Sequence, residues 1–297
     1  MPKLFNLIIL ITTFIFLDFR LSKTNIPFRN NSFFMGSENF LEKIKETKGQ
    51  RRIILVGGSS LGFGVSAKEL SKDLNILTLN TGLNVNVNFK NYIRIIKDDI
   101  NKDKDILVFS PEYDFHLQKS FFNKYRSREF CEIALFAKNI YPLDCVGYAT
   151  TKLFGISALI NKKNEGLYRR DGFNEYGDYI FRVKLINGKK LSDACMNLSF
   201  DDFKENYLPY LKALKADGYN LVYIPNFIPK SKCTKISEVI EVDKVLTKNF
   251  GTFKTKGSKK LFFDLKYFYD TSYHLNQEGV KVKTDIFRNH LLNYLGI

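Results

Sequence analysis

The first candidate for chemistry is a serine that stands among glycines. The residues from Val56 to Gly64 read Val-Gly-Gly-Ser-Ser-Leu-Gly-Phe-Gly and follow a short apolar run. Glycines around Ser59 allow a sharp turn from strand to helix, which would present a hydroxyl group beside backbone N–H groups. A phosphate loop is a rival interpretation, but the Lys-Ser/Thr pair of a P-loop is missing and the Gly-x-Gly-x-x-Gly spacing does not fit. A glycine turn without chemistry is the third alternative.

Two further stretches carry groups that would complement such a serine. Asp270 and His274 stand close together just before a helical pattern. A carboxylate near an imidazole fixes its tautomer and stabilises the imidazolium, which a serine nucleophile needs from its base. Asn80-Thr-Gly82 follows a second apolar run, and the N–H of Gly82 could donate to an oxyanion. Each of these patterns also occurs in loops that have no chemistry.

Short apolar runs that alternate with helical patterns predict the frame that positions these residues. The strand-like runs are Arg52–Gly57, Ile76–Asn80, Asp105–Ser110 and Asn220–Ile224. The helical patterns are at Glu38–Lys48, Ser66–Leu74, Asn88–Ile100, from Phe203 to the stop at Asp217-Gly218, and from the N-cap Asn276 onward. Strands separated by helices pair in parallel, so we expect an α/β fold, a three-layer α/β/α sandwich with a mainly parallel sheet. Ligands bind such sheets at the carboxyl ends of the strands, where the candidate residues stand.

Apolar stripes and a break in the alternation complete this picture. One stripe consists of Phe203, Tyr207, Leu211 and Leu214, and the last helix carries Val280, Thr284, Phe287 and Leu291 on one face. Between about residues 118 and 199 the alternation of strands and helices breaks down. We interpret this segment as an insertion over one edge of the sheet.

The N-terminus contains an apolar run, Leu4–Leu17, behind a single Lys3. The run is shorter than the about 20 residues of a spanning helix, yet no small-residue cleavage site follows it. We therefore favour an uncleaved signal anchor over residues 1–24 above a cleaved signal peptide. A linker and leading helix over 25–50 and an α/β domain over 51–297 follow.

The anchor predicts a membrane-anchored protein with an extracytoplasmic body, at the periplasm or the cell surface. The flanking charges conflict with this orientation. Arg20, Lys23 and Arg29 outnumber the positive charges ahead of the apolar run, and the positive-inside rule does not favour an outward-facing body.

Composition limits the possible partners. The chain has 297 residues, of which 44% are hydrophobic, and this excludes a mainly disordered protein. An excess of 46 Lys and Arg over 31 Asp and Glu leaves a net charge of +15, which suits phospholipid or an acidic polysaccharide. Nucleic acid is not expected, because no binding motif accompanies the charge. Basic residues gather at 162–190 and 230–260, as solvated faces or as docking surfaces. No Cys-x-x-Cys pair is present, and we expect neither metal nor cofactor.

The order of these stretches resembles the SGNH (GDSL-like) hydrolase superfamily, in particular its membrane-anchored bacterial members associated with envelope polysaccharide. Gly57-Gly-Ser59 is similar to the nucleophile block, with Gly58 in place of the usual Asp, and Asn80-Thr-Gly82 is similar to the glycine block. Asp270 to His274, followed by Leu-Asn-x-x-Gly, is similar to the Asp/His block, with a spacing one residue longer than the commonest. The resemblance implies a flavodoxin-like SGNH fold in which Ser59 is the nucleophile, His274 the base and Asp270 its orienting carboxylate. The N–H groups of Ser59 and Gly82 would then stabilise the oxyanion, and Ser60 is an alternative nucleophile.

One block departs from the family pattern. The family supplies an oxyanion-hole asparagine after the third strand, but this chain reads Ser110-Pro-Glu-Tyr-Asp114 there. The lost donor is worth about 10²–10³ in rate. Glu112 and Tyr113 would line the substrate site instead, with Glu112 either shaping the pocket or repelling an anionic intermediate.

The resemblance implies a serine-dependent esterase or O-acyltransferase that acts on acetyl esters of cell-envelope or exported polysaccharide. Its substrate would be a carbohydrate or acyl ester, and envelope biosynthesis proteins are possible partners. The alternative is a catalytically degenerate binding or scaffolding subunit of an envelope polysaccharide assembly. Gly58 and the missing asparagine favour the alternative, whereas Ser59, Asp270 and His274 favour the enzyme.

Overall fold

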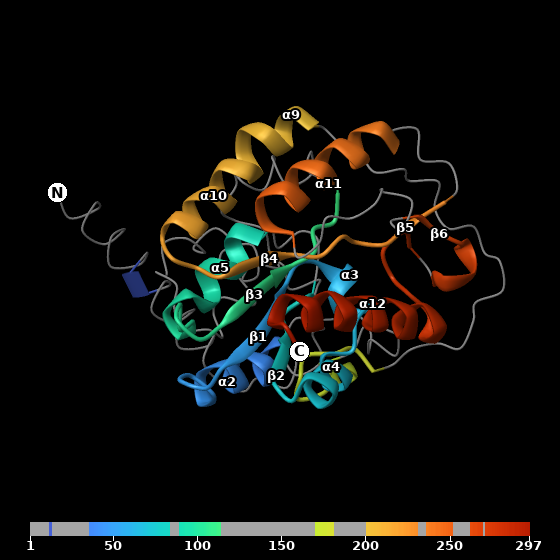
Figure 1. Ribbon diagram of the computed structural model, residues 1–297. Helices are drawn as coiled ribbons and strands as arrows, with labels where there is room; N and C mark the ends of the chain where they lie inside the picture. Colours follow the sequence, from blue (N-terminus) through green and yellow to red (C-terminus); the bar gives the residue numbers. More distant parts are fainter. Residues whose placement is uncertain are drawn as a thin grey trace.

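A four-stranded parallel sheet lies at the centre of the protein (Figure 1). The computed structural model describes residues 12–13, 36–83, 89–113, 170–180, 200–230, 236–251, 262–269 and 271–297. The strands run in the order β2-β1-β3-β4 and comprise β1 (Arg52–Val56), β2 (Leu77–Asn80), β3 (Ile106–Phe109) and β4 (Leu221–Tyr223). Each lies within a run that the sequence predicted as a strand, and the predicted parallel pairing is confirmed.

The apolar strands are buried on both faces of the sheet. Ile54 of β1 pairs in register with Leu79 of β2 and with Leu107 of β3. Successive side chains of a strand point to opposite faces, so Ile54 and its neighbour Ile53 enter two different hydrophobic clusters. Such strands need continuous apolar runs rather than alternating ones, as the sequence has.

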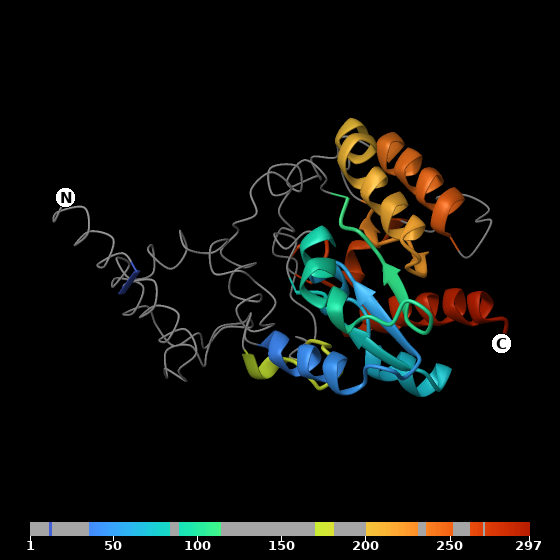
Figure 2. The ribbon, with the colours of Figure 1, turned by 90° about the vertical axis from the view of Figure 1, so that its left-hand side faces the viewer.

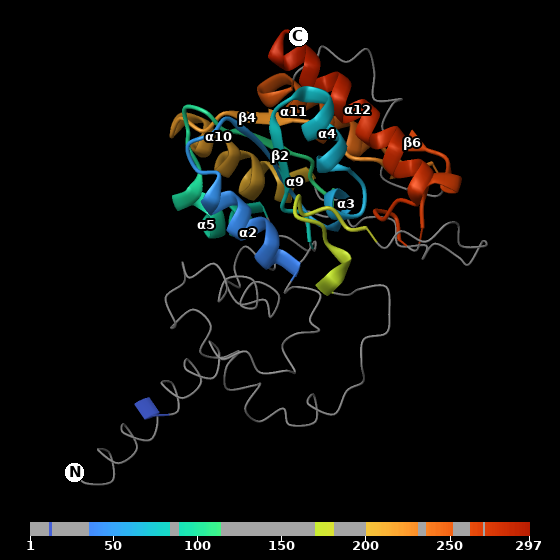
Figure 3. The ribbon, with the colours of Figure 1, turned by 90° about the horizontal axis from the view of Figure 1, so that it is seen from below.

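Helices cover both faces of the sheet. One face carries α2 (Ser37–Glu46), α5 (Phe89–Ile96), α10 (Leu208–Ala216) and α11 (Ile236–Phe250). The other carries α4 (Ala67–Leu74) and α12 (Gln277–Leu295). Figure 2 shows α10 and α11 side by side, and Figure 3 shows α4 and α12 on the side of the sheet opposite α2 and α5. This α/β arrangement is compatible with a three-layer sandwich.

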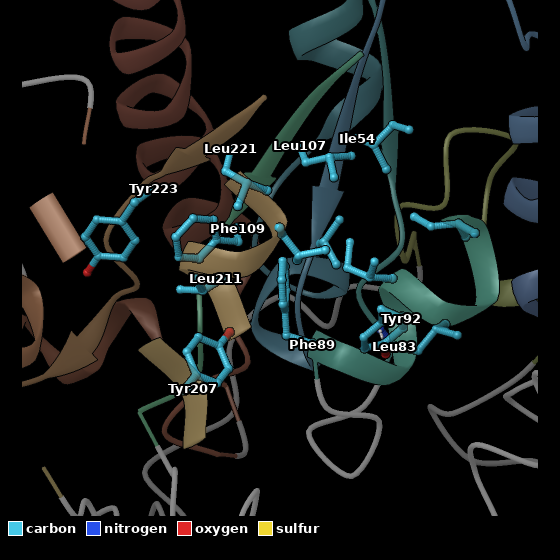
Figure 4. Packing of buried hydrophobic residues seen from close by; sticks show 14 of the residues in the cluster. Ile54, Leu83, Phe89, Tyr92, Leu107, Phe109, Tyr207, Leu211, Leu221 and Tyr223 are labelled. Atoms are coloured by element: carbon cyan, nitrogen blue, oxygen red, sulfur yellow. Dashed lines mark hydrogen bonds between the residues drawn. The ribbon is translucent and has the colours of Figure 1, made fainter. Parts of the chain in front are cut away.

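Many aromatic side chains pack together in the larger of these two clusters. Phe89 of α5 packs against Phe109 of β3 and against Tyr207, with ring centroids 5.6 and 5.9 Å apart (Figure 4). The predicted stripe from Phe203 to Leu214 is buried in this cluster. The helical segment that carries this stripe starts with α9 (Phe200–Asp202) and continues through a π-helical turn at Phe203–Tyr207 into α10. The sequence did not predict the π-helical turn.

The helix caps confirm two predicted boundaries. α4 begins after Ser66, whose side chain accepts a hydrogen bond from the N–H of Glu69. α12 begins after Asn276, whose side chain accepts from the N–H of Gly279. Both residues occupy the N-cap position, where a short polar side chain replaces a missing intrahelical acceptor.

Two segments whose role the sequence left open, 230–260 and 170–180, pack against the sheet. The lysine-rich region 230–260 contains α11, which buries an apolar face that includes Val242 and Leu246 beside β4. The segment 170–180, which belongs to the region read as an insertion, lies beside the edge strand β2, where the N–H of Asn80 donates to the carbonyl of Tyr176 at 2.7 Å.

The predicted anchor at 1–24 lies outside the described residues, except for Thr12 and Thr13. Within the described ranges, no helix combines the length and the apolar character that a bilayer crossing requires. Asp270 also lies outside the described residues.

Candidate functional site

The glycine-rich turn places Ser59 at the carboxyl end of β1, as the first residue of the short helix α3 (Ser59–Gly62). Ser59 is half-buried, whereas Ser60 is fully buried. Of the two serines, Ser59 therefore offers the hydroxyl group that another molecule can reach. In the described part of the chain, the N–H of Ser59 donates no hydrogen bond.

Close main-chain packing holds this turn against the loop after β2. A Cβ atom on Gly62 would lie 2.0 Å from the carbonyl oxygen of Gly82, and one on Gly82 would lie 2.6 Å from the carbonyl oxygen of Gly58. Contacts this short between a Cβ and backbone atoms cannot be relieved by a rotamer change. The glycines at 62 and 82 are thus required for α3 to approach the end of β2.

Glu112 enters the same site from the chain after β3. Its Oε1 accepts from Ser59 Oγ at 3.1 Å and from the N–H of Ser60 at 2.7 Å. The side chain is only 2% exposed. Burial raises the pKa of Glu112, and the Ser60 hydrogen bond and the charge of His274 oppose this rise.

His274 lies in the loop that precedes α12. The imidazole is buried and stacks on Phe63, with ring centroids 4.3 Å apart and an interplanar angle of 22°. Phe63 in turn packs on Tyr179 at 4.4 Å, and Tyr179 on Phe173 at 5.1 Å. The charge of His274 opposes the rise in the pKa of the Glu112 carboxyl group, which also accepts a hydrogen bond from the Ser59 hydroxyl. Ser59 Oγ itself donates to Glu112 in this structure.

Gly82 lies close to Ser59, but its N–H is already engaged. It donates to Asn80 Oδ1 at 3.0 Å, while Asn80 Nδ2 donates to the carbonyl of Leu61 at 3.0 Å. An oxyanion that bound Gly82 would have to share or break the bond to Asn80. The N–H of Ser59 has no such competitor among the described residues.

Tyr113 is fully buried, although the sequence suggested a place at the substrate. Its hydroxyl group lies 2.8 Å from the hydroxyl of Tyr223, which donates to Asp243 Oδ1 of α11 at 2.9 Å. Burial raises the pKa of Asp243. Tyr113 therefore belongs to a polar chain inside the core between β4 and α11.

The sequence did not point to two residues of the site, Lys283 and its hydrogen-bond partner Asn226. Lys283 of α12 is fully buried, and its Nζ donates to the carbonyl of Ser60 at 2.9 Å and to Asn226 Oδ1 at 2.7 Å. Burial lowers the pKa of Lys283 to about 7, and the charge of Glu112 opposes this fall. The signal was present: Lys283 is three residues after Val280 and four before Phe287, within the predicted apolar face.

The assembled groups are of the kinds that nucleophilic chemistry uses. The Ser59 hydroxyl contacts the Glu112 carboxyl group at the carboxyl edge of a parallel sheet, the usual ligand site of such folds, and the charge of His274 acts on the same carboxyl group. In the described residues, no three His, Cys, Asp or Glu side chains form a cluster that could hold a metal ion. Searches of protein-family models, curated proteins and solved structures find no significant match to this chain.

Proposed function

We propose that the protein is a serine-dependent esterase or O-acyltransferase of the SGNH type, acting on acetyl esters of cell-envelope or exported polysaccharide. The observation that carries the proposal is the half-buried hydroxyl of Ser59 at the end of β1, in contact with a carboxyl group on which the charge of the buried His274 acts. The strand order β2-β1-β3-β4 is consistent with a flavodoxin-like frame for this site.

The proposed reaction proceeds through an acyl-enzyme. Ser59 Oγ attacks the ester carbonyl carbon while its proton passes to His274, which Asp270 orients. The oxyanion accepts from the N–H of Ser59, and the protonated imidazole then gives its proton to the leaving alcohol. Water completes an esterase cycle and a sugar hydroxyl completes a transferase cycle. The Ser59 hydroxyl must turn from Glu112 to the imidazole before the attack.

The proposed location follows from the N-terminus and the charge. Residues 1–24 would anchor the protein in the membrane with its body outside the cytoplasm. The net charge of +15 would draw this body to an anionic glycan or to phospholipid headgroups.

One observation favours a second candidate, a binding or scaffolding subunit of an envelope polysaccharide assembly. The Ser59 hydroxyl donates to Glu112, and a carboxylate at this point repels an oxyanion. A protein that keeps the fold for binding a glycan needs neither the free hydroxyl nor the oxyanion hole.

Serine reactivity distinguishes the two candidates. The full-length protein is treated with a fluorophosphonate probe and with p-nitrophenyl acetate, beside Ser59→Ala, His274→Ala and the control Ser60→Ala. We expect labelling and turnover to fall about 10³-fold or more in the first two variants and to persist in Ser60→Ala. A folded wild-type protein that neither labels nor turns over would instead support the binding subunit.

A further inference from the structure

The main chain of Ser60 is held from both sides by buried ionisable side chains. Glu112 Oε1 accepts the N–H of Ser60 at 2.7 Å, and Lys283 Nζ donates to its carbonyl oxygen at 2.9 Å. Glu112 follows β3, whereas Lys283 lies on α12, near the C-terminus. A carboxyl group and an amine thus both hydrogen-bond to the main chain of Ser60, the residue directly after Ser59.

A second path links the same two side chains. Lys283 Nζ also donates to Asn226 Oδ1 at 2.7 Å, and Asn226 Nδ2 donates to the carbonyl of Pro111 at 3.3 Å. Pro111 directly precedes Glu112. The hydrogen bonds therefore close a ring through Ser60, Lys283, Asn226 and the Pro111-Glu112 segment, which joins the ends of β1, β3 and β4 to α12.

Packing alone does not account for an amine at position 283. The Nζ atom lies 5.7 Å from the ring centroids of both Phe227 and Phe287, and the side chain is fully buried. An apolar side chain would fill such a place without the desolvation penalty that a buried amine carries. The presence of an amine is therefore explained by its hydrogen bonds to Ser60 and Asn226 and by its electrostatic attraction to Glu112.

We propose that Lys283 is a positioning residue that acts with Glu112 through Ser60 to hold the Ser59 turn and to set how readily the side chain at position 59 ionises. The inference deepens the proposed function, on which it rests for its catalytic meaning. The two groups act in opposite directions: the cation favours a negative charge at position 59, and the carboxylate opposes it. His274 and Tyr207 also face Glu112, and they are unchanged in the comparison below.

The test replaces the nucleophile by a thiol, so that the readout does not depend on catalysis. In full-length Ser59→Cys protein, the rate of iodoacetamide alkylation at position 59 is followed by peptide mass spectrometry at pH 6.5. Only the thiolate reacts, so the rate reports its pKa. We expect Lys283→Met to slow alkylation about fivefold and Glu112→Gln to accelerate it about fivefold. The matched control is Lys281→Met, an exposed lysine on the same helix, with a change below about twofold.

The outcomes separate this inference from the proposed function. A rate in Lys283→Met equal to that in Lys281→Met overturns the inference, and so does a shift in the same direction in Lys283→Met and Glu112→Gln, as a merely loosened turn would give. Opposite shifts support it even if wild-type Ser59 does not react with fluorophosphonate, a result that counts only against the proposed function. If Lys283→Met does not fold, Lys283→Gln, which keeps a donor without the charge, should show the same slowing.

Discussion

The carboxyl group of Glu112 lies against the main chain of Gly58, in the space that a side chain at position 58 would fill. A Cβ atom there would come within 2.6 Å of Glu112 Cδ. Gly58 has extended dihedral angles (φ −86°, ψ −159°) that any residue adopts, so the Glu112 carboxyl group, rather than the backbone conformation, opposes a side chain at position 58. Gly58 and Glu112 are also two positions at which the sequence departs from the SGNH pattern. The two departures are in direct contact, because the Glu112 carboxyl group fills the space left by the missing side chain at position 58.

The Gly58–Glu112 contact predicts that a methyl group at position 58 is tolerated only without the glutamate. Gly58→Ala should lower the free energy of unfolding by about 1–3 kcal/mol in the wild-type background. In a Glu112→Ala background the same substitution should cost less than about 0.5 kcal/mol, because the obstructing carboxyl group is gone. Urea denaturation of the four proteins measures both costs. Equal costs in the two backgrounds would contradict the contact.

The buried hydroxyl of Ser60 predicts that the substitution Ser60→Ala is harmless. Ser60 Oγ has no hydrogen-bond partner in the described part of the structure, so Ser60→Ala removes no bond and should change the free energy of unfolding by less than about 0.5 kcal/mol. Urea denaturation gives this value, and fluorophosphonate labelling of the same variant should match the wild type. A loss of labelling in a stable Ser60→Ala protein would assign the reactive hydroxyl to Ser60.

Lys283 predicts a rise in stability with pH. Its pKa is about 7 in the folded protein, against 10.5 for an ordinary lysine. Between these values the unfolded chain binds more protons than the folded protein, so this group makes the free energy of unfolding rise from pH 7 to pH 10. The slope is at most about 1.4 kcal/mol per pH unit. Urea denaturation from pH 7 to 9.5 should show this rise in the wild type and a flatter curve in Lys283→Met, while parallel curves would exclude the shifted lysine.

The ion pair of Arg52 and Asp105 predicts a large effect on stability far from Ser59. Both side chains are fully buried, with Arg52 Nη2 2.6 Å from Asp105 Oδ2, at the amino ends of β1 and β3. Asp105→Ala leaves a buried guanidinium without its counter-charge and should cost about 3–5 kcal/mol in denaturant unfolding. The exposed pair of Lys230 and Asp264, at 3.0 Å, is the control: Asp264→Ala should cost less than about 1 kcal/mol. Similar costs at the two sites would refute the prediction.

Asp178 predicts a link between the segment 170–180 and the glycine loop. Its carboxylate accepts from the N–H groups of Ala67 and Lys68 at 2.7 and 3.0 Å, and from Asn80 Nδ2 at 3.3 Å. Asp178→Ala removes a cap of α4 and should cost about 1–2 kcal/mol. It should also increase hydrogen exchange at the N–H of Gly82, because Asn80 loses a partner. Exchange that rises at α4 alone would show that Asn80 does not depend on Asp178.

Local sequence patterns were sufficient for the frame of the protein. The apolar run at Arg52–Gly57, the helical pattern that starts at Ser66 and the N-cap Asn276 depend on their immediate neighbours, and the structure confirms them. The site depends instead on contacts across the chain. Lys283 and Ser60 are 223 positions apart, and nothing near either residue indicates the other. A lysine on an apolar helix face was visible, but its partners were not.

The aromatic column from Phe173 through Tyr179 and Phe63 to His274 ties the imidazole to a distant part of the chain. The ring of His274 rests on Phe63, and Phe63 is braced by Tyr179 of the segment that enters the chain between β3 and β4. The packing that supports the His274 ring therefore comes in part from outside the sheet. The segment 170–180 thus supports the His274 ring through Phe63, although it stands far from His274 in the sequence.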